Sequence, residues 1–240
     1  MDGYVARKFG LSAFTMKMIA ILAMTCCHAA IVFEDSLSIY LMFVLNTVGG
    51  LTFPIMAYLI VEGYNKTSNI KKYLFRLLFF GLVSAIPAFL ILGRLSVLFT
   101  LLLGLCSLVL RDSVKNKSLF WLCFIGMTLI SMLFDWSLIG IPLIFAYGTL
   151  KGEKRRVIIP TTVILTAGLV LTLVLDILRE GLSMQFALDT CFMLTGICTI
   201  PLLLAYNGKR GYSPSSLRYL FYIYYPAHFM VLFCLSWLIH

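Results

Sequence analysis

Long apolar runs, separated by short polar segments, recur along the whole chain. A helix that crosses a hydrocarbon core of about 30 Å needs roughly 20 apolar residues, and several runs approach this length. The candidate spans cover residues 14–33, 41–62, 73–92, 95–110, 118–134, 136–150, 157–176, 184–205 and 218–239. The spans at 95–110 and 136–150 are short, so they could be tilted, re-entrant or buried among the others. The pattern therefore predicts an all-α fold, a polytopic bundle of about eight or nine transmembrane helices.

The composition excludes an ordinary soluble domain. Hydrophobic residues make up 61% of the chain and charged residues 12%, with a mean hydropathy of +1.00, far from the average of soluble proteins. The 240 residues contain no internal repeat and no Pro/Gly/Ser-rich linker, so we expect a single integral membrane domain over residues 1–240. Lys17 lies inside the first apolar run, which lacks a small-residue cleavage site and is therefore expected to be a retained span.

The basic residues predict the orientation, because Lys and Arg in short loops are retained in the cytoplasm during insertion. The net charge of +9 is carried by clusters between apolar runs, which indicates lipid headgroups and topology rather than nucleic acid. If the N-terminus is cytoplasmic, all basic residues except Arg94 and Arg179 fall on that side: Arg7, Lys8, Lys17, Lys66, Lys71, Lys72, Arg76, Arg111, Lys115, Lys117, Lys151, Lys154, Arg155, Arg156, Lys209, Arg210 and Arg218. The outer side then holds Glu34, Asp35, Asp135, Glu180 and the C-terminal His240.

The chain carries no signature of a soluble enzyme or of a metal site. No CxxC spacing occurs among its cysteines, which all lie in apolar runs and are interpreted as small packing residues: Cys26, Cys27, Cys106, Cys123, Cys191, Cys198 and Cys234. GxSxG, Walker, GxGxxG and HExxH motifs are also absent from the sequence.

Ionisable residues at membrane depth are the candidates for function, because a charge inside the bilayer costs at least a few kcal/mol unless it is paired or hydrated. They are His28, Glu62, Arg76, Arg94, Asp135, Asp189 and His228. Histidine is the side chain best suited to take and return a proton near neutral pH.

His228 lies in an unusually polar stretch of the last span. Tyr224 and Tyr225 precede it by four and three residues and share its face, while Pro226 lacks a backbone donor and frees the carbonyl of Tyr222. A structural histidine, hydrogen-bonded to a neighbouring helix, is the alternative.

The second span carries polar or small residues at every fourth position. Asn46, Gly50, Pro54, Tyr58 and Glu62 form a row that drifts by about 40° per step and could line a passage to the cytoplasmic end. Close helix packing at the glycines is the alternative.

A basic cluster follows Glu62. Lys66, Lys71, Lys72 and Arg76 could hold a phosphorylated ligand by charge-assisted hydrogen bonds, or could simply set the topology and reach into the headgroups. On the opposite side, Asp135, Arg94 and His28 are expected at similar depth, so a carboxylate–arginine pair beside a histidine is geometrically possible.

The chain resembles the TraX family, membrane proteins of conjugative and pilus systems that are associated with N-terminal acetylation of pilin. The resemblance is carried by residues 17–33, 49–87, 96–105, 134–148 and 222–231, which follow the family order. Its most specific parts are the segment around Phe53, Pro54, Glu62, Gly63 and Tyr64, then Tyr73 and Arg76, and the closing Tyr225, Pro226 and His228. Two positions depart from the family pattern: Cys27 stands where relatives have an aspartate before the histidine, and residues 49–52 lack an arginine that many relatives carry.

The resemblance implies acyl transfer in the bacterial cytoplasmic (inner) membrane. Acetyl-CoA is cytoplasmic and polyanionic, which suits a donor site at Glu62, Lys66, Lys72, Tyr73 and Arg76. The implied catalytic residues are His228 as first choice, His28 as second, Arg94 to stabilise negative charge, and Asp135. The implied cavity residues are Asn46, Tyr58, Tyr224, Tyr225 and Asp189. The acceptor would be a pilin N-terminus or another surface substrate.

Two other functions fit the same residues. A small permease or channel would use the polar side chains to line a proton or solute path. An assembly scaffold of a pilus or conjugation system would need no chemistry.

Overall fold

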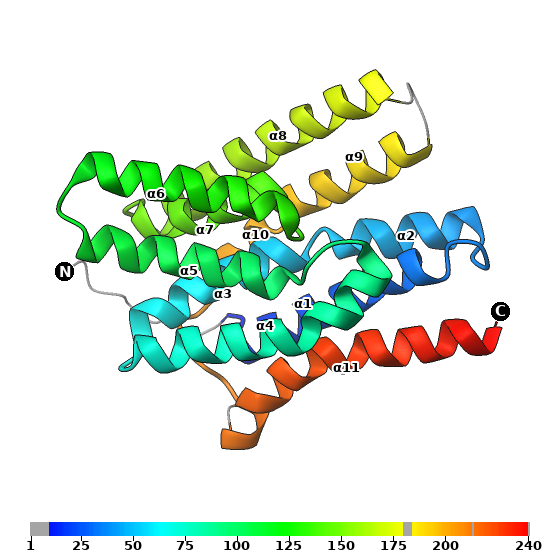
Figure 1. Ribbon diagram of the computed structural model, residues 1–240, viewed down its shortest axis with the longest axis horizontal. Helices are drawn as coiled ribbons and strands as arrows, with labels where there is room; N and C mark the ends of the chain where they lie inside the picture. The colour runs from blue at the N-terminus through cyan, green and yellow to red at the C-terminus, as the bar shows by residue number, and fades with distance from the viewer. Residues whose placement is uncertain (1–9, 180–183, 213, 240) are drawn as a thin grey trace. The chain divides into compact units, whose positions relative to one another are not determined.

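The computed structural model of the chain describes residues 10–179, 184–212 and 214–239. Arg7, Lys8, Glu180 and His240 lie outside the described residues. Helices make up the regular structure of the described ranges, which hold no strand, and their labels are shown in Figure 1. They are α1 (Ala13–Val32), α2 (Ile39–Gly49), α3 (Thr52–Lys66), α4 (Ile70–Leu92), α5 (Val97–Ser113), α6 (Lys117–Ile130), the 3-10 helix η1 (Ser131–Leu133), α7 (Ser137–Thr149), α8 (Glu153–Arg179), α9 (Met184–Ile197), α10 (Ile200–Leu204) and α11 (Ser215–Ile239).

The predicted all-α membrane fold is confirmed. Six helical segments are long and apolar enough to cross a membrane: Ala13–Val32, Ile39–Lys66, Ile70–Leu92, Glu153–Arg179, Met184–Leu204 and Leu220–Leu238. Shorter apolar helices occupy Lys117–Leu133 and Ser137–Thr149, and α5 fills the remaining predicted span with 17 residues. At 13 residues α7 is about 20 Å long, too short to span alone. It belongs to the buried class anticipated for the short spans, because Ile141, Leu143 and Ile144 are fully enclosed.

Two of the predicted spans are interrupted, which the hydropathy pattern did not predict. The 41–62 span divides into α2 and α3 at Gly50 and Leu51, and the 184–205 span divides into α9 and α10 at Cys198 and Thr199. A proline follows each break by a few residues. Because proline has no N–H, Pro54 cannot donate to the carbonyl of Gly50, and Pro201 cannot donate to that of Ile197. A missing donor thus accompanies each break, although Pro87, Pro142, Pro160 and Pro226 lie inside continuous helices.

Side-chain caps determine where several helices begin. Ser12, Ser38, Asn69, Ser96 and Asn116 each accept a hydrogen bond from a backbone N–H in the first turn of the helix that follows. Such caps satisfy donors that have no partner within the helix, which matters most where water is scarce.

The chain forms two compact units. Unit 1 comprises Met1–Met56 and Glu153–Phe221. In it α1 packs on α2, α2 on α9, α9 on α8, and α8 on α10. At the start of α1 the backbone of Leu11 pairs with the segment after α10: Leu11 N donates to Ala205 O at 2.8 Å, and Asn207 N donates to Leu11 O at 3.0 Å.

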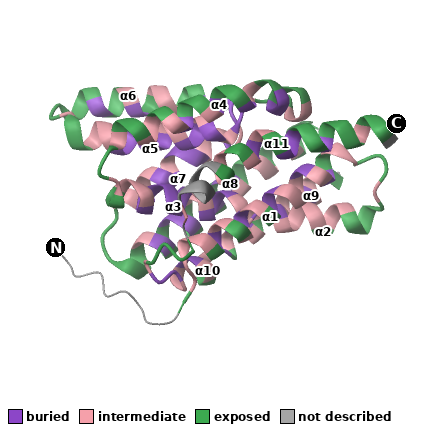
Figure 2. Cartoon of the chain, turned by 90° about the horizontal axis from the view of Figure 1, so that it is seen from below, coloured by how far each residue is buried: buried purple, intermediate pink, exposed green. Residues whose placement is uncertain are grey.

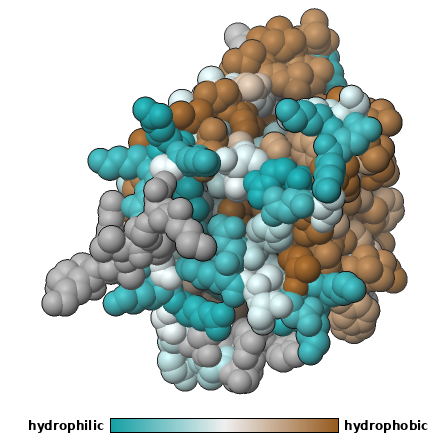
Figure 3. Space-filling view, turned by 90° about the vertical axis from the view of Figure 1, so that its left-hand side faces the viewer, coloured by the Kyte–Doolittle hydropathy of each residue, from teal (hydrophilic) through white to brown (hydrophobic). Residues whose placement is uncertain are grey.

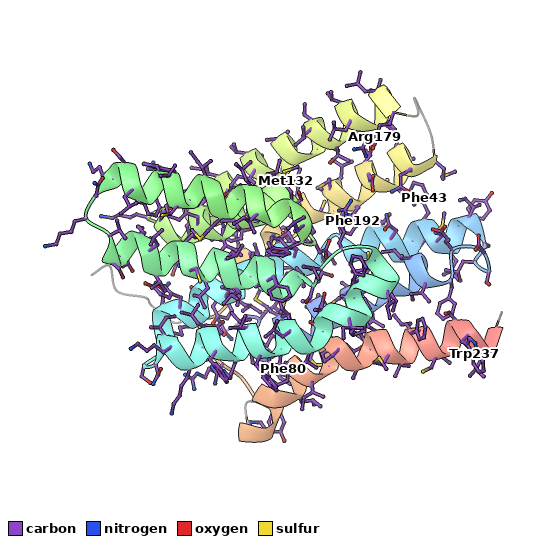
Figure 4. The ribbon with its side chains drawn as sticks, viewed as in Figure 1. Phe43, Phe80, Met132, Arg179, Phe192 and Trp237 are labelled. Atoms are coloured by element: carbon purple, nitrogen blue, oxygen red, sulfur yellow. The ribbon has the colours of Figure 1, made fainter. Side chains whose placement is uncertain are left out.

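Unit 2 comprises Ala57–Gly152 and Tyr222–His240. Its central helix is α5, which packs against α4, α6 and α7. The approach to α7 is closest at Gly104, where an added Cβ would lie 2.3 Å from Ile144 Cδ1. Figure 2 shows the buried positions of α5 and α7 beside the exposed apolar positions of α6. The outer faces of α4, α6 and α11 expose large apolar side chains such as Ile86, Leu122 and Trp237, of which Figure 4 labels Trp237. These faces therefore suit a lipid environment.

The two ends of unit 2 carry different residues. Arg111 on α5 donates from Nη1 to Gly148 O on α7 at 2.9 Å, so the ends of these helices lie together, beside the connections that hold Lys115, Lys117 and Lys151. The opposite end joins residues 94–97 to 133–136, where Leu95 N donates to Leu133 O at 3.1 Å. Hydrophilic side chains gather on the face in Figure 3, which looks onto the left-hand side of Figure 1, where α5 connects to α6. Most basic residues of unit 2 thus lie at one end and residues 94–97 and 133–136 at the other, in agreement with the alternating charge pattern of the sequence. Which end faces the cytoplasm stays a prediction.

Candidate functional site

The predicted donor site lies where α3 ends and α4 begins. Glu62 is 4% exposed, and its Oε2 lies 3.0 Å from Lys66 Nζ one turn later. Asn69 caps α4 by accepting from Lys72 N at 2.9 Å, which leaves the Lys71 and Lys72 side chains exposed on the first turn. The structure thus pairs Glu62 with Lys66, while Lys72 projects outward.

Arg76 lies between two aromatic rings in unit 2. The guanidinium carbon is 5.6 Å from the ring centroid of Tyr73 and 6.0 Å from that of Tyr222 on α11, and the guanidinium also hydrogen-bonds the Tyr222 side chain. Tyr222 stacks on Phe80 with centroids 5.1 Å apart, and Figure 4 labels Phe80 on α4. Tyr73 lies so close to the α3 backbone that a Cβ at Gly63 would be 2.7 Å from its hydroxyl. The two rings and the Tyr222 hydrogen bond therefore fix where the guanidinium lies.

The Nε of Arg76 is buried and donates to no residue of the described part of the chain. A planar guanidinium with an unused donor is suited to bind a phosphate or carboxylate. Of the basic residues predicted for the donor site, Lys66 pairs with Glu62 and Arg76 contacts two aromatic rings.

His228 is 5% exposed and surrounded by aromatic rings of its own helix. Its Nδ1 lies 3.1 Å from the carbonyl oxygen of Tyr224. The Tyr224 ring is parallel to the imidazole, with centroids 5.4 Å apart and an interplanar angle of 5°, whereas Tyr225 approaches edge-on at 68°. Tyr224, Tyr225 and His228 therefore share one face of α11, as their spacing predicts.

The Tyr225 hydroxyl connects α11 to the start of α5. It accepts a hydrogen bond from Val97 N at 3.3 Å and bonds the side chain of Ser96. Tyr225 is 4% exposed, and Asp135 lies near enough to act on it electrostatically. The α11 segment that carries His228 is thereby attached to the loops of the Arg94 end.

Asp135 lies in the loop between η1 and α7. Its Oδ1 accepts from Trp136 N at 3.0 Å, and its carbonyl oxygen accepts from Thr100 Oγ1 at 2.6 Å. Burial raises the pKa of the Asp135 carboxyl above its ordinary value, an effect that the Trp136 N–H and the nearby Arg94 partly offset. Arg94 is exposed and lies near enough to Asp135 to act on its carboxyl electrostatically.

The backbone after Asp135 is strained. Trp136 has φ 62° and Ser137 has φ 26°, both in the left-handed region that residues with a Cβ rarely adopt. Such conformations persist where the surroundings impose them, and they occur often at functional sites. Asp135 immediately precedes this strained turn.

Three of the remaining candidates, His28, Asn46 and Asp189, belong to unit 1. His28 is 5% exposed on α1. Asn46 donates from Nδ2 to Leu188 O at 3.2 Å, and its Oδ1 lies 3.9 Å from Cys27 Sγ. Asp189 accepts from Gln185 Nε2 at 3.0 Å. Because His28 belongs to unit 1 whereas Arg94 and Asp135 belong to unit 2, the grouping of all three stays a prediction.

The predicted row on the second span is interrupted. Asn46 lies on α2, but Tyr58 and Glu62 lie on α3, beyond the break at Gly50 and Leu51. Tyr58 is buried and contacts the Tyr147 ring edge-on at 5.7 Å. At Gly50 the packing alternative fits, because an added Cβ would lie 2.0 Å from Phe192 O.

The profile of the TraX protein family matches residues 12–236 of the chain. The chain belongs to the TraX family. A relative from Dichelobacter nodosus, described as a probable fimbrial assembly protein FimC of serogroup H1, is 31% identical over 245 residues, which cover 95% of this chain and 97% of the relative. No solved structure matches the chain.

In this TraX chain Cys27 lies against the backbone of Gly49, where α1 packs on α2. A Cβ at Gly49 would lie 2.4 Å from Cys27 Cβ and 3.0 Å from its sulfur.

Sequence reasoning missed several residues that this TraX chain uses to build the site. Tyr222 contacts Arg76, and Ser96 contacts Tyr225, although each pair is far apart in sequence. The Tyr222 carbonyl was noted as freed by Pro226, but nothing in the spacing assigned its ring to Arg76. At the basic end, Asp112 accepts from Tyr64 Oη at 2.5 Å and from Arg111 Nε at 2.7 Å, and no motif marks this network.

Proposed function

We propose that this TraX chain is a membrane-embedded acyltransferase that moves an acetyl group from cytoplasmic acetyl-CoA to a pilin N-terminus or another extracytoplasmic acceptor. Family membership supports this proposal, since the TraX resemblance implies pilin acetylation. The name of the D. nodosus relative refers to fimbrial assembly, which agrees with a role beside a pilus protein. The bacterial inner membrane and a cytoplasmic N-terminus are parts of the same proposal, supported by the charge pattern.

One observation carries the proposal: a single stretch of α11 connects the donor-site candidates to the outer-loop candidates. Tyr222 contacts Arg76, Tyr225 bonds the start of α5 beside Asp135, and His228 follows Tyr225 by less than one turn. His228 therefore lies beyond both contacts along α11, next to the outer-loop candidates, where the acceptor is expected. The donor contact at Tyr222 lies on the same helix, less than two turns away.

The donor half rests on charge. CoA carries several phosphates, and Lys66, Lys72 and Arg76 offer cations at one end of unit 2, with Arg76 oriented by Tyr73 and Tyr222. Charge-assisted bonds from a planar guanidinium are among the strongest that a phosphate can make. Glu62 holds Lys66 and limits its freedom.

The chemistry follows from acyl transfer to an amine. The amine nitrogen attacks the thioester carbonyl carbon, an N–C bond forms, the C–S bond breaks, and CoA leaves as a thiolate. The proton lost by the amine passes to the imidazole of His228 and then to the thiolate. Arg94 would stabilise the negative oxygen of the tetrahedral intermediate. A buried Asp135 beside it suits the recognition of the acceptor's amine.

The test is transfer of labelled acetyl from acetyl-CoA by the purified protein in nanodiscs, with pilin-like peptides bearing a free N-terminus and with surface glycans as acceptors. His228→Ala should lower the rate by about 10²- to 10⁴-fold, the usual contribution of a general base. His28→Ala tests the second choice in the same assay, and His240→Ala serves as the matched control. Undiminished transfer by a folded His228→Ala variant would remove His228 from the mechanism.

A non-catalytic scaffold is the second candidate, because the relative is named for assembly and not for an enzymatic activity. It predicts that the purified protein binds no CoA and transfers no acetyl group, while still associating with its pilus system.

A further inference from the structure

A buried hydroxyl holds the backbone directly before the left-handed turn at Trp136 and Ser137. Thr100 Oγ1, in the first turn of α5, donates to the carbonyl oxygen of Asp135 at 2.6 Å. The N–H of the same residue is also paired, because Asp135 N donates to Leu95 O at 3.1 Å. Thr100 is fully buried, so solvent does not reach its hydroxyl. Both backbone hydrogen-bonding groups of Asp135 are therefore attached to residues 95–100.

A second buried hydroxyl holds the backbone on the other side of the turn. Ser131 Oγ on η1 lies 2.7 Å from Ser137 O and 2.6 Å from Thr128 O, so its one hydrogen is shared between two carbonyl oxygens. Ser131 is fully buried as well. Trp136 and Ser137 have φ angles of 62° and 26°, which residues with a Cβ adopt where their surroundings impose them. The two hydroxyl groups supply that constraint.

We infer that Thr100 and Ser131 are positioning residues, which hold the left-handed turn so that the Asp135 carboxyl keeps its place. The inference about the turn stands on the contacts above, and its consequence for acceptor binding rests on the proposed function. Asp135 Oδ1 accepts from Trp136 N, so the orientation of the carboxyl follows the backbone of the turn. Each hydroxyl thus acts through Asp135 and not on the reacting atoms.

Tryptophan fluorescence reports on the turn without any acyl donor. The chain has three tryptophans, of which Trp136 is 9% exposed whereas Trp121 and Trp237 are 50% and 78% exposed. In a background with Trp121→Phe and Trp237→Phe, acrylamide quenching of the protein in nanodiscs therefore measures the exposure of Trp136 alone.

The decisive pair of variants is Thr100→Val and Thr100→Ser. Valine keeps the branched shape and removes the hydroxyl, which leaves the Asp135 carbonyl oxygen without this donor. We expect Thr100→Val to raise the quenching constant of Trp136 at least about twofold, because the turn opens locally. Thr100→Ser keeps the hydroxyl and should retain the value of the background protein.

Thr149→Val is the matched control, since Thr149 Oγ1 donates to Phe145 O of its own helix at 2.9 Å, at the far end of α7. It should leave the quenching unchanged. Ser131→Ala removes the second hydroxyl and should also raise the quenching constant, so it decides the inference should Thr100→Val not fold. Unchanged quenching in Thr100→Val and Ser131→Ala would overturn the inference. Equal increases in Thr100→Val and Thr100→Ser would overturn it too.

Kinetics separate this inference from the proposed function. If the chain transfers acetyl groups, Thr100→Val should raise the KM for the acceptor amine at least about threefold and leave the KM for acetyl-CoA unchanged, because Asp135 is proposed to recognise the acceptor. A merely structural role would lower the amount of folded protein and change neither KM. If no sample transfers acetyl groups, wild type included, the proposed function fails while the quenching result still decides the role of Thr100 and Ser131.

Discussion

Arg76 differs from the neighbouring basic residues in what surrounds it. Lys71 and Lys72 are exposed on the first turn of α4, where solvent and headgroups screen their charge. Arg76 lies one turn further on, between the rings of Tyr73 and Tyr222, with a buried Nε. A guanidinium held in this way contributes direction as well as charge, which a lysine at the same position cannot do.

Replacing Arg76 with lysine should therefore weaken donor binding although the charge is kept. Loss of the planar, two-ring environment and of the bond to Tyr222 is expected to raise the Kd for acetyl-CoA about tenfold. Isothermal titration of the purified protein measures this. Arg155→Lys, the same change at an exposed position at the start of α8, should leave the Kd unchanged, and equal affinities for Arg76→Lys and wild type would exclude Arg76 from the donor site.

Asp112 illustrates a charge whose role is to hold helices together. Its hydrogen bond from Arg111 Nε, and to a smaller degree the bond from Tyr64 Oη, lower the pKa of its carboxyl below the ordinary value despite partial burial. Because Arg111 also donates to Gly148 O, this one carboxylate connects the ends of α3, α5 and α7.

The lowered pKa of Asp112 predicts a stability contribution that acid removes. The contribution is fully present above the unfolded-state pKa of about 3.9 and is lost as the pH falls through the lower folded-state value. Since the Asp112 side chain is 47% exposed, we expect Asp112→Asn to cost less than about 1 kcal/mol at pH 6. Thermal unfolding of both proteins should converge once the pH falls below the folded-state pKa of Asp112. A difference that persists there, or one reproduced by the exposed control Asp35→Asn, would contradict this role.

Sequence spacing predicted the local contacts of the site and missed the distant ones. Glu62 meets Lys66, and His228 meets Tyr224, because residues four apart on a helix are neighbours. The contacts of Tyr222 with Arg76 and of Tyr225 with Val97 join α11 to α4 and α5. Their partners are more than a hundred residues away, and no periodicity in a single sequence specifies which helices meet.

At the scale of elements, apolar length predicted where helices occur and failed where they break. Hydropathy averages over a window, so residues 41–62 read as one span although the missing donor of Pro54 ends α2 before α3 begins. The break between α2 and α3 also bears on the role of Gly50. Gly50 has helix-like φ and ψ angles of −57° and −23°, so its lack of a side chain serves the contact with α9 rather than an unusual backbone conformation.

Gly50→Ala should therefore destabilise the fold through packing alone. The new Cβ would lie 2.0 Å from Phe192 O and 3.0 Å from Phe192 C, both backbone atoms that cannot rotate away, so α2 and α9 must separate. Overpacking of this kind costs about 1–3 kcal/mol. Unfolding in detergent, followed by helicity, measures the loss.

Gly126→Ala on α6 is the matched control. An added Cβ there meets nothing within 4 Å, and alanine in a helix interior is favoured over glycine by roughly 0.5–1 kcal/mol. The control should be neutral or stabilising. If both variants lose the same stability, the close approach of α2 to α9 is not what Gly50 provides.

At the scale of the whole chain, basic and acidic residues lie at different helix ends and connections. Basic residues lie in the last turn of α3, in the first turn of α4 and in the connections after α5 and α7, whereas Arg94 and Asp135 lie in the connections at the other end of unit 2. In unit 1, the connection between α1 and α2 carries Glu34 and Asp35 and no basic residue. Since insertion retains Lys and Arg in the cytoplasm, the donor-site candidates and the acidic connections should face opposite compartments.

Cysteine labelling tests this orientation in cells. In a background whose seven native cysteines are replaced by serine or alanine, single cysteines are introduced at Asp35, after α1, and at Ser113, at the end of α5, both exposed positions. We expect a membrane-impermeant maleimide to label Asp35→Cys in intact cells with a permeabilised outer membrane, and to label Ser113→Cys only after the inner membrane is opened. The positive-inside rule applies to all loops together. The reverse labelling pattern would therefore mean that the whole chain has the opposite orientation in the membrane. Arg76 would then face away from cytoplasmic acetyl-CoA, which would remove the proposed route from donor to acceptor.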